Sequence, residues 1–408
     1  MFSFGSFCVV IALLALGDLA SAKTKGVLPS VFVISLLFLV GYWSGLLPAD
    51  IVTRVGLGAP LAYFAMSIMV VQMGSMISLQ RLASEWRSVV IAATGLAGMV
   101  AFLLIFGKMI IDWETVVVAT PPLTGGVVAA QMIAQAAVER GFSNLAGLAT
   151  LIYIFQGFVG YPLTAWCLRL EGRRLLDMRQ TDPQMLCALP DEMDKPDKNA
   201  AEIRPFFATL QRTTSFTRIA LISLVALAAD LVSIAMREFL AYFAPSLVIY
   251  TLPPLVLCFL FGCLATKYRV TDRRALARTS SVGFLVIIVT AHIMEFLSGA
   301  TPEMVLSSLS ALVVTIGVGT AGLVCFSAAA SKFFDASIPM AVALSLTALF
   351  GFPPNFLLAD EAARHLSTNA DEYHFLMQRT LPQMLVGGFV TVMIASVLIA
   401  ELFVKILG

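Results

Sequence analysis

Residues 113–138 read WETVVVATPPLTGGVVAAQMIAQAAV, an apolar stretch whose centre is interrupted by Thr120-Pro121-Pro122-Leu123-Thr124-Gly125-Gly126. Proline removes a backbone donor and clashes with the preceding turn, and glycine is costly inside a helix. Two consecutive prolines therefore predict that a helix ends here. Neither arm is long enough to cross a bilayer comfortably by itself. The stretch is predicted to be a re-entrant hairpin or a discontinuous membrane helix.

A second apolar stretch is interrupted in the same way. Residues 337–365 contain Gly351-Phe352-Pro353-Pro354-Asn355, and this break again has a double proline followed by a polar residue. Thr124 and Asn355 are residue types that favour the N-cap position, so we expect them to begin the second arm of each broken stretch.

The remaining apolar stretches are uninterrupted. Runs of about 20 apolar residues match a hydrocarbon core of about 30 Å at a rise of about 1.5 Å per residue. The chain is 59% hydrophobic and only 12% charged, with a mean hydropathy of +0.92. Soluble domains carry about 25% charged residues. These features predict an all-α integral membrane protein, and the crossing runs are residues 2–22, 27–46, 57–79, 88–107, 144–168, 219–236, 247–265, 280–298, 304–326 and 380–404.

The order of the runs is the same in the two halves of the chain. Residues 1–168 and residues 218–408 each hold five crossing runs plus one broken run, and a polar linker, residues 169–217, separates them. Asp18-Leu19-x-Ser21 has an echo in Asp230-Leu231-x-Ser233. We therefore predict two repeats, each of five transmembrane helices plus a re-entrant hairpin or broken helix.

The distribution of positive charge indicates the topology. If both broken runs return to the side they entered and the N-terminus lies outside, 21 of the 26 Lys and Arg residues lie inside and 5 outside. Treating both as full crossings gives at best 18 to 8. The positive-inside rule favours hairpins, and the second repeat is then inverted relative to the first. Both termini are expected on the outer side of the membrane.

Paired interruptions in two inverted halves indicate a transporter's binding site. A helix that stops inside the membrane leaves N–H or C=O groups that must meet protein, water or a ligand. N–H groups after the glycines suit a carboxylate, and freed carbonyls near Thr120 and Phe352 suit Na⁺. The candidate substrate and ion residues are Thr120, Pro121, Pro122, Leu123, Thr124, Gly125, Gly126, Gln131, Gly351, Phe352, Pro353, Pro354 and Asn355. Gln131 either lines the cavity or bonds between helices.

Two acids in the first run of each half are further candidates. Asp18 and Asp230 either carry an ion or proton, or lie near a helix end and reach water. As an acid pair they would make the protein an intramembrane enzyme, but symmetric placement does not by itself bring two carboxylates together. We assign no catalytic residue and expect no enzyme activity. The six cysteines lack metal-ligand spacing, so no metal or cofactor is expected, and a net charge of +1 gives no indication of nucleic-acid binding.

Several short motifs resemble the bacterial sodium/glutamate symporter family, and the likeness covers nearly the whole chain in run order and linker position. Thr124-Gly125-Gly126 is similar to the start of that family's Ser-Gly-Gly-His-Gly-Thr motif. Glu139-Arg140-Gly141-Phe142-x-Asn144 resembles its Glu-Arg-x-Gly-Phe-x-Asn stretch, and Lys332-x-x-Asp335-Ala336 its Lys-x-x-Asp-Ala. Gly351-Phe352-Pro353-Pro354-Asn355 resembles its Gly-Ala-Thr-Pro-Thr tip. Val127, Val128 and Ala129 stand where the family has His, Gly and Thr.

The resemblance implies a homodimeric carrier in the bacterial inner membrane that takes up glutamate or a related carboxylate by Na⁺ symport, with a moving transport domain that carries both hairpins. H⁺ is the other coupling ion that we consider. An exporter or a channel-like carrier of another small solute on the same fold remains the alternative function.

Overall fold

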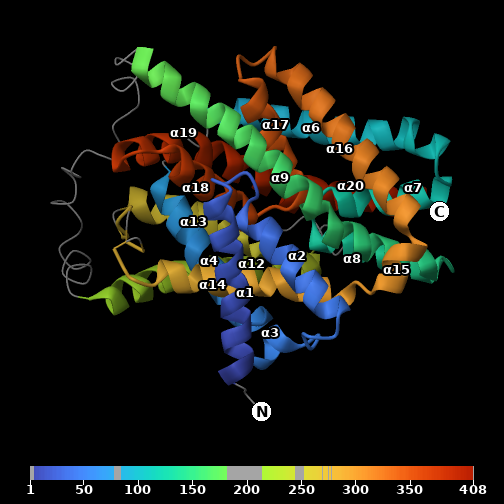
Figure 1. The fold of residues 1–408 in the computed structure, drawn as a ribbon, viewed down its shortest axis with the longest axis horizontal. Helices are drawn as coiled ribbons and strands as arrows, with labels where there is room; N and C mark the ends of the chain where they lie inside the picture. Colours follow the sequence, from blue (N-terminus) through green and yellow to red (C-terminus); the bar gives the residue numbers. More distant parts are fainter. Residues whose placement is uncertain are drawn as a thin grey trace. The chain divides into compact units, whose positions relative to one another are not determined.

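A computed structural model describes residues 4–77, 84–181, 214–243, 252–268, 270–273, 275–276 and 278–407. Within these ranges the regular structure is helical and no strand occurs (Figure 1). Eight helices there are long and apolar enough to cross a membrane: Phe4–Lys23, Ala59–Met76, Trp86–Met109, Asn144–Arg179, Ser215–Phe243, Val282–Gly299, Leu309–Ser331 and Ala370–Ile406. The predictions of an all-α fold and of a multi-pass membrane protein are confirmed.

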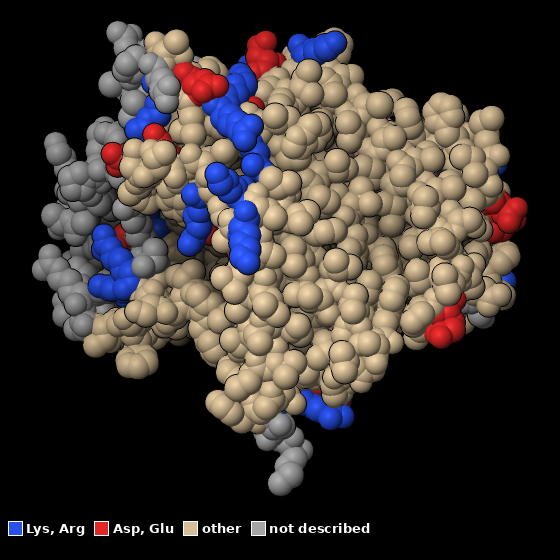
Figure 2. All heavy atoms as spheres, viewed as in Figure 1, with Lys and Arg blue, Asp and Glu red and all other residues tan. Residues whose placement is uncertain are grey.

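Two of the ten expected crossings are shorter than predicted. Helices α2 (Ser30–Trp43) and α13 (Pro254–Lys267) have 14 residues each, about 21 Å at the usual rise. Figure 2 shows that on the visible face most of the surface carries no Lys, Arg, Asp or Glu atom, as a lipid-facing surface requires.

The chain forms two compact units, and each contains segments from both halves of the sequence. Unit 1 consists of residues Met1–Val52, Glu85–Asp177 and Ile293–Gly408, and unit 2 of Thr53–Ser84 and Met178–His292. The short helix α3 (Ile51–Arg54) lies where the chain passes from the first unit to the second. The twofold division of the sequence into repeats is a separate matter and stays a prediction.

Unit 2 is built around a close pair of helices, α4 (Ala59–Met76) and α13, together with α12 (Ser215–Phe243) and most of α14 (Val282–Glu295). A Cβ added to Gly74 of α4 would lie 2.0 Å from the Phe259 carbonyl oxygen of α13. In return, a Cβ on Gly262 would lie 2.2 Å from the Val71 carbonyl oxygen. Glycine at both positions lets the two backbones touch, which is the usual basis of helix association in membranes.

Unit 1 contains both broken stretches. Its elements are α1 (Phe4–Lys23), α2, α6 (Trp86–Ile105), η1 (Gly107–Met109), α7 (Trp113–Leu123), α8 (Val127–Glu139), α9 (Ser143–Thr181, whose last residues belong to unit 2), η4 (Phe296–Gly299), α15 (Pro302–Ser307), α16 (Leu309–Ser331), α17 (Ile338–Leu346), η5 (Thr347–Leu349), α18 (Pro354–Leu366), α19 (Ala370–Gly388), η6 (Phe389–Ala395) and α20 (Ser396–Ile406).

The pair α6 and α16 forms the centre of unit 1. Gly98 and Gly322 face each other, since a Cβ on Gly322 would lie 2.5 Å from the Gly98 carbonyl oxygen. Gly95 lies beside Ser327 and Met99 beside Gly319, so residue numbers fall along α16 as they rise along α6. The two helices are therefore antiparallel.

Part of the expected polar linker is helical. Helix α9 continues to Thr181, well beyond the end of the apolar run at residue 168, and α12 begins at Ser215. The rest of the linker, residues 182–213 with Cys187, lies outside the described residues, as does Arg81 of the charge count.

Candidate functional site

The first broken stretch is a hairpin of α7 and α8 that turns at Thr124-Gly125-Gly126. The prolines lie before the turn and do not form the tip, because Pro121 and Pro122 are inside the last turn of α7. Each proline lacks the N–H that would bond to the carbonyl oxygen four residues earlier, which weakens this last turn. The Thr124 N–H donates to the Pro121 carbonyl oxygen at 3.1 Å and the Gly125 N–H to that of Pro122 at 3.0 Å, and these tight bonds end the helix.

The second broken stretch consists of α17 and η5, a turn over residues 350–353, and the returning helix α18. Gly351 has φ +63°, the left-handed region that glycine enters without a Cβ penalty. The Gly351 N–H donates to the Thr347 carbonyl oxygen at 2.7 Å. Both interruptions predicted from the sequence are therefore genuine breaks.

The two tips touch each other through their backbones. Gly125 has φ +88°, and a Cβ added to it would lie 1.9 Å from the Ala348 carbonyl oxygen of η5. The residues of the first break, from Thr120 to Gly126, are buried, and so are Gly351, Pro353, Pro354 and Asn355 of the second, while Phe352 is partly buried. Segments more than 200 residues apart in the sequence thus form one packed site.

The hairpins reach this meeting point from opposite ends of the α6 and α16 pair. Leu123, at the end of α7, packs on Gly319, where an added Cβ would lie 2.3 Å from its Cδ2. Ser345, near the end of α17, packs on Gly95, whose added Cβ would lie 2.8 Å from the Ser345 Oγ. These two contacts lie near the middle of the pair. The hairpins enter from its opposite ends, since Val116 of α7 lies beside Gly107, just past the C-terminal end of α6, while Phe334, just before α17, packs on Trp86 at the N-terminal end of α6.

A π-helical segment lies against both tips. Residues Ala370–Ile406 form one continuous helix, and within it η6 is π-helical. Added Cβ atoms on Gly125 and Gly351 would both lie 3.1 Å or less from Val392 of η6, and one on Gly126 would lie 2.4 Å from the Ser396 Oγ. Single turns of π-helix interrupt the regular ladder of backbone bonds and often occur at functional sites.

Neither expected N-cap residue caps its helix. Gly126 is the N-cap of α8, and the Thr124 hydroxyl instead donates to the Pro121 carbonyl oxygen at 2.6 Å. Pro353 is the N-cap of α18, and Asn355 lies inside the helix, where its Nδ2 donates to the Met384 carbonyl oxygen of α19 at 3.2 Å. Gly126 and Pro353 occupy the two N-cap positions instead. The prediction that Thr124 and Asn355 are N-cap residues was therefore wrong.

As a result, the two tips differ in the backbone donors they offer. No side chain caps α8, and its first bond runs from the Ala130 N–H to the Gly126 carbonyl oxygen, so the N–H groups of residues 127–129 precede the helical ladder. In α18 the Asn355 N–H donates to the Gly351 carbonyl oxygen, and the Phe356 N–H donates to the Asn355 Oδ1. The first tip is therefore the one with backbone N–H groups of the kind that suit an anion.

The remaining candidates lie away from the tips or are paired. Gln131 is exposed, on the side of α8 opposite its buried face. Asp18 is exposed on α1, and Asp230 of unit 2 accepts a hydrogen bond from the Tyr63 hydroxyl at 2.7 Å. The Thr120 hydroxyl donates to the Val116 carbonyl oxygen at 2.7 Å.

A carboxylate that the sequence analysis did not single out anchors the second hairpin. Glu361 of α18 accepts hydrogen bonds from the Ser30 N–H at 3.0 Å, from the Ser30 hydroxyl at 3.0 Å and from the Ser21 hydroxyl. It thereby satisfies the N-terminus of α2, where negative charge is favoured. The only sequence signal is the acidic pair Asp360-Glu361 near the end of an apolar stretch.

Replacing Glu361 with alanine is expected to lower the free energy of unfolding by about 1–3 kcal/mol, because the Ser30 N–H loses its charged partner. Denaturant unfolding in detergent micelles measures the change. Glu238→Ala, at an exposed glutamate of α12, is the matched control and should stay within about 0.5 kcal/mol of the wild type. Equal stability of the two variants would show that Glu361 does not hold α18 to α2.

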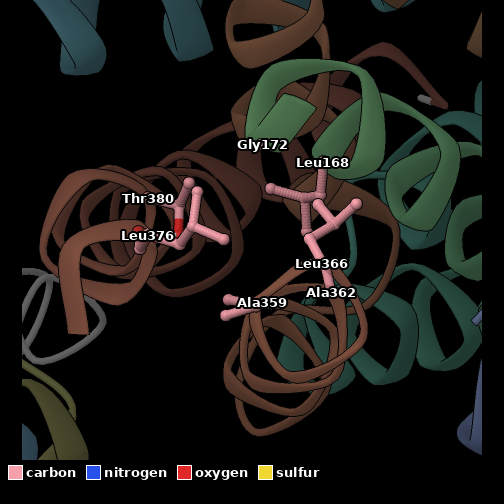
Figure 3. A pocket seen from close by; sticks show the side chains of 8 residues that line it. Leu168, Gly172, Ala359, Ala362, Leu366, Leu376 and Thr380 are labelled. Atoms are coloured by element: carbon pink, nitrogen blue, oxygen red, sulfur yellow. Dashed lines mark hydrogen bonds between the residues drawn. The ribbon is translucent and has the colours of Figure 1, made fainter. Parts of the chain in front are cut away.

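An apolar pocket lies beside the second hairpin, between α9, α18 and α19 (Figure 3). It is a small, partly open hollow, and its lining is Leu168, Gly172, Ala359, Ala362, Ala363, Leu366, Leu376 and Thr380. Figure 3 shows the Leu168 side chain of α9 beside the Leu366 side chain of α18. With one hydroxyl in its lining, this pocket has no group that would recognise an anion.

No protein-family model matches the chain, and no curated protein matches it.

Proposed function

We propose that this protein is a secondary active transporter that carries a small anionic solute, glutamate or a related carboxylate, together with Na⁺ by alternating access. It acts as a homodimer in a bacterial inner membrane, and its solute binds where the two hairpin tips meet. The resemblance to the sodium/glutamate symporter family motivates the choice of solute and ion.

The contact of the Gly125 backbone with the Ala348 carbonyl group is the observation that carries the proposal. Two interrupted helices that meet inside an apolar unit place unpaired main-chain groups at a depth where lipid cannot satisfy them. Such a pair of broken helices is the binding arrangement of many secondary transporters. The N–H groups that begin α8 receive the carboxylate, and carbonyl and hydroxyl oxygens of the tips receive Na⁺.

The opposite approach of the hairpins also supports alternating access. Each tip closes the site toward one end of the α6 and α16 pair, so withdrawal of one hairpin opens the site toward one side only. The two glycine positions with left-handed backbone, Gly125 and Gly351, allow the backbone of each tip to turn sharply.

Purified protein in liposomes is expected to accumulate a labelled carboxylate when a Na⁺ gradient is imposed. The panel is L-glutamate, L-aspartate, 2-oxoglutarate and succinate, each tested with an inward Na⁺ gradient, an inward H⁺ gradient and no gradient. Gly125→Leu, which drives a large side chain into the Ala348 backbone, is the inactive control. Uptake that is equal in this variant would remove the tip from the mechanism. Flux that needs no ion gradient would instead favour a channel-like carrier.

A further inference from the structure

Helix α9 passes both hairpins of unit 1. Early in α9, Ala149 belongs to a buried cluster with Val117 and Ile133 of the first hairpin. Three turns later, Gly160 touches the second tip, since a Cβ there would lie 2.8 Å from the Phe350 Cδ1. The turns of α9 between these two contacts therefore pass from the arms of the first hairpin to the tip of the second.

Gln156 lies in this interval, one turn before Gly160 and on the same side of α9. Its side chain is 1% exposed, and neither its Oε1 nor its Nε2 has a hydrogen-bond partner. Thr164, one turn after Gly160, is fully buried and its Oγ1 also has no partner. A polar strip with unused hydrogen-bonding capacity thus flanks the contact between α9 and the second tip.

An unpaired buried amide is a costly feature. Buried polar groups in proteins are almost always hydrogen-bonded, and each unsatisfied donor or acceptor is strongly destabilising. Leucine has a similar volume and would fill the same space without this penalty. A solute that brings a complementary donor and acceptor removes the penalty when it binds.

We infer that Gln156 determines the specificity of the tip site, with its Nε2 donating to an acceptor oxygen of the solute and its Oε1 accepting from a solute N–H. The inference rests on the proposed function and adds which chemical groups of the solute the site recognises. The solute carries an N–H donor next to its carboxylate. The side chains at the start of α8, Val127, Val128 and Ala129, are apolar, so this part of the tip supplies only backbone groups.

Binding and uptake of L-glutamate and glutarate test the inference, because glutarate lacks only the amino group. Wild-type protein is expected to prefer L-glutamate by about tenfold or more, as expected for one hydrogen bond between the amide and a charged group. In Gln156→Leu the affinity for L-glutamate should fall about tenfold more than that for glutarate, which abolishes the preference. The thermal midpoint of the solute-free variant should stay the same or rise, since the unpaired amide is gone.

Gln131→Leu, at an exposed glutamine of α8, is the matched control and should keep the preference. An equal effect of Gln156→Leu on both compounds, or no effect, overturns the inference. Binding of neither compound to the wild-type protein overturns it as well. A wild-type protein that binds both compounds but moves neither across the membrane contradicts the proposed transport, while the comparison of affinities still decides the role of Gln156.

Discussion

Gly125→Ala is expected to reduce solute uptake at least about tenfold, whereas Gly141→Ala should leave it within about twofold of the wild type. Both glycines have a left-handed backbone, with φ +88° and φ +85°, so both variants carry the same conformational strain. They differ in their surroundings. The new methyl at position 125 would lie 1.9 Å from the Ala348 carbonyl oxygen, and nothing lies within 4 Å of the one at position 141.

The clash cannot be relieved by a side-chain rotation, because the obstructing atom belongs to the backbone. Overpacking of this kind costs about 1–3 kcal/mol, and a cost of about 2 kcal/mol corresponds to a roughly 30-fold smaller population with docked tips. Initial rates of uptake in liposomes measure the effect, with unfolding curves of both variants beside them. If the two alanine variants lose activity to the same extent, the strain of the glycine backbone explains the loss and the tip contact does not.

Gly74→Ala is expected to destabilise unit 2 by about 1–3 kcal/mol or more. The added methyl would lie 2.0 Å from the Phe259 carbonyl oxygen, so α4 and α13 must move apart. The higher helix propensity of alanine offsets only about 1 kcal/mol. Thermal unfolding in detergent should show a clear fall of the midpoint.

Gly317→Ala is the matched control for this prediction. Gly317 also lies inside a helix, α16, but nothing lies within 4 Å of its added Cβ. The variant should therefore gain about 0.5–1 kcal/mol from propensity alone. A stability gain in both variants would contradict the close contact between α4 and α13.

The sequence predicted the breaks better than their surroundings. Pro121-Pro122 and Pro353-Pro354 located both interruptions to within a few residues, because proline and glycine act on the local backbone. The contact between Gly125 and Ala348 joins segments far apart in the chain, and no local pattern predicts it.

The identity of the side chains around the tips was harder to predict. Gln131 was a candidate because it follows the first tip, but small residues such as Ala129 and Ala137 define the buried face of α8 and leave it exposed. Gln156 is one of a few polar residues in an apolar run. Only its burial without a partner distinguishes it from a glutamine that forms an interhelical hydrogen bond. Burial and pairing depend on neighbouring helices, which the run itself does not specify.

Thiol labelling of Ala348→Cys, in a protein whose native cysteines are replaced by serine or alanine, tests the meeting of the tips most directly. The site is buried where the first tip touches it, so a membrane-impermeant reagent reaches it only when a hairpin withdraws. We expect labelling from either side of the liposome membrane, slowed from both sides by saturating solute and Na⁺. A protein that still transports while this thiol reacts from neither side would contradict a solute site between the hairpins.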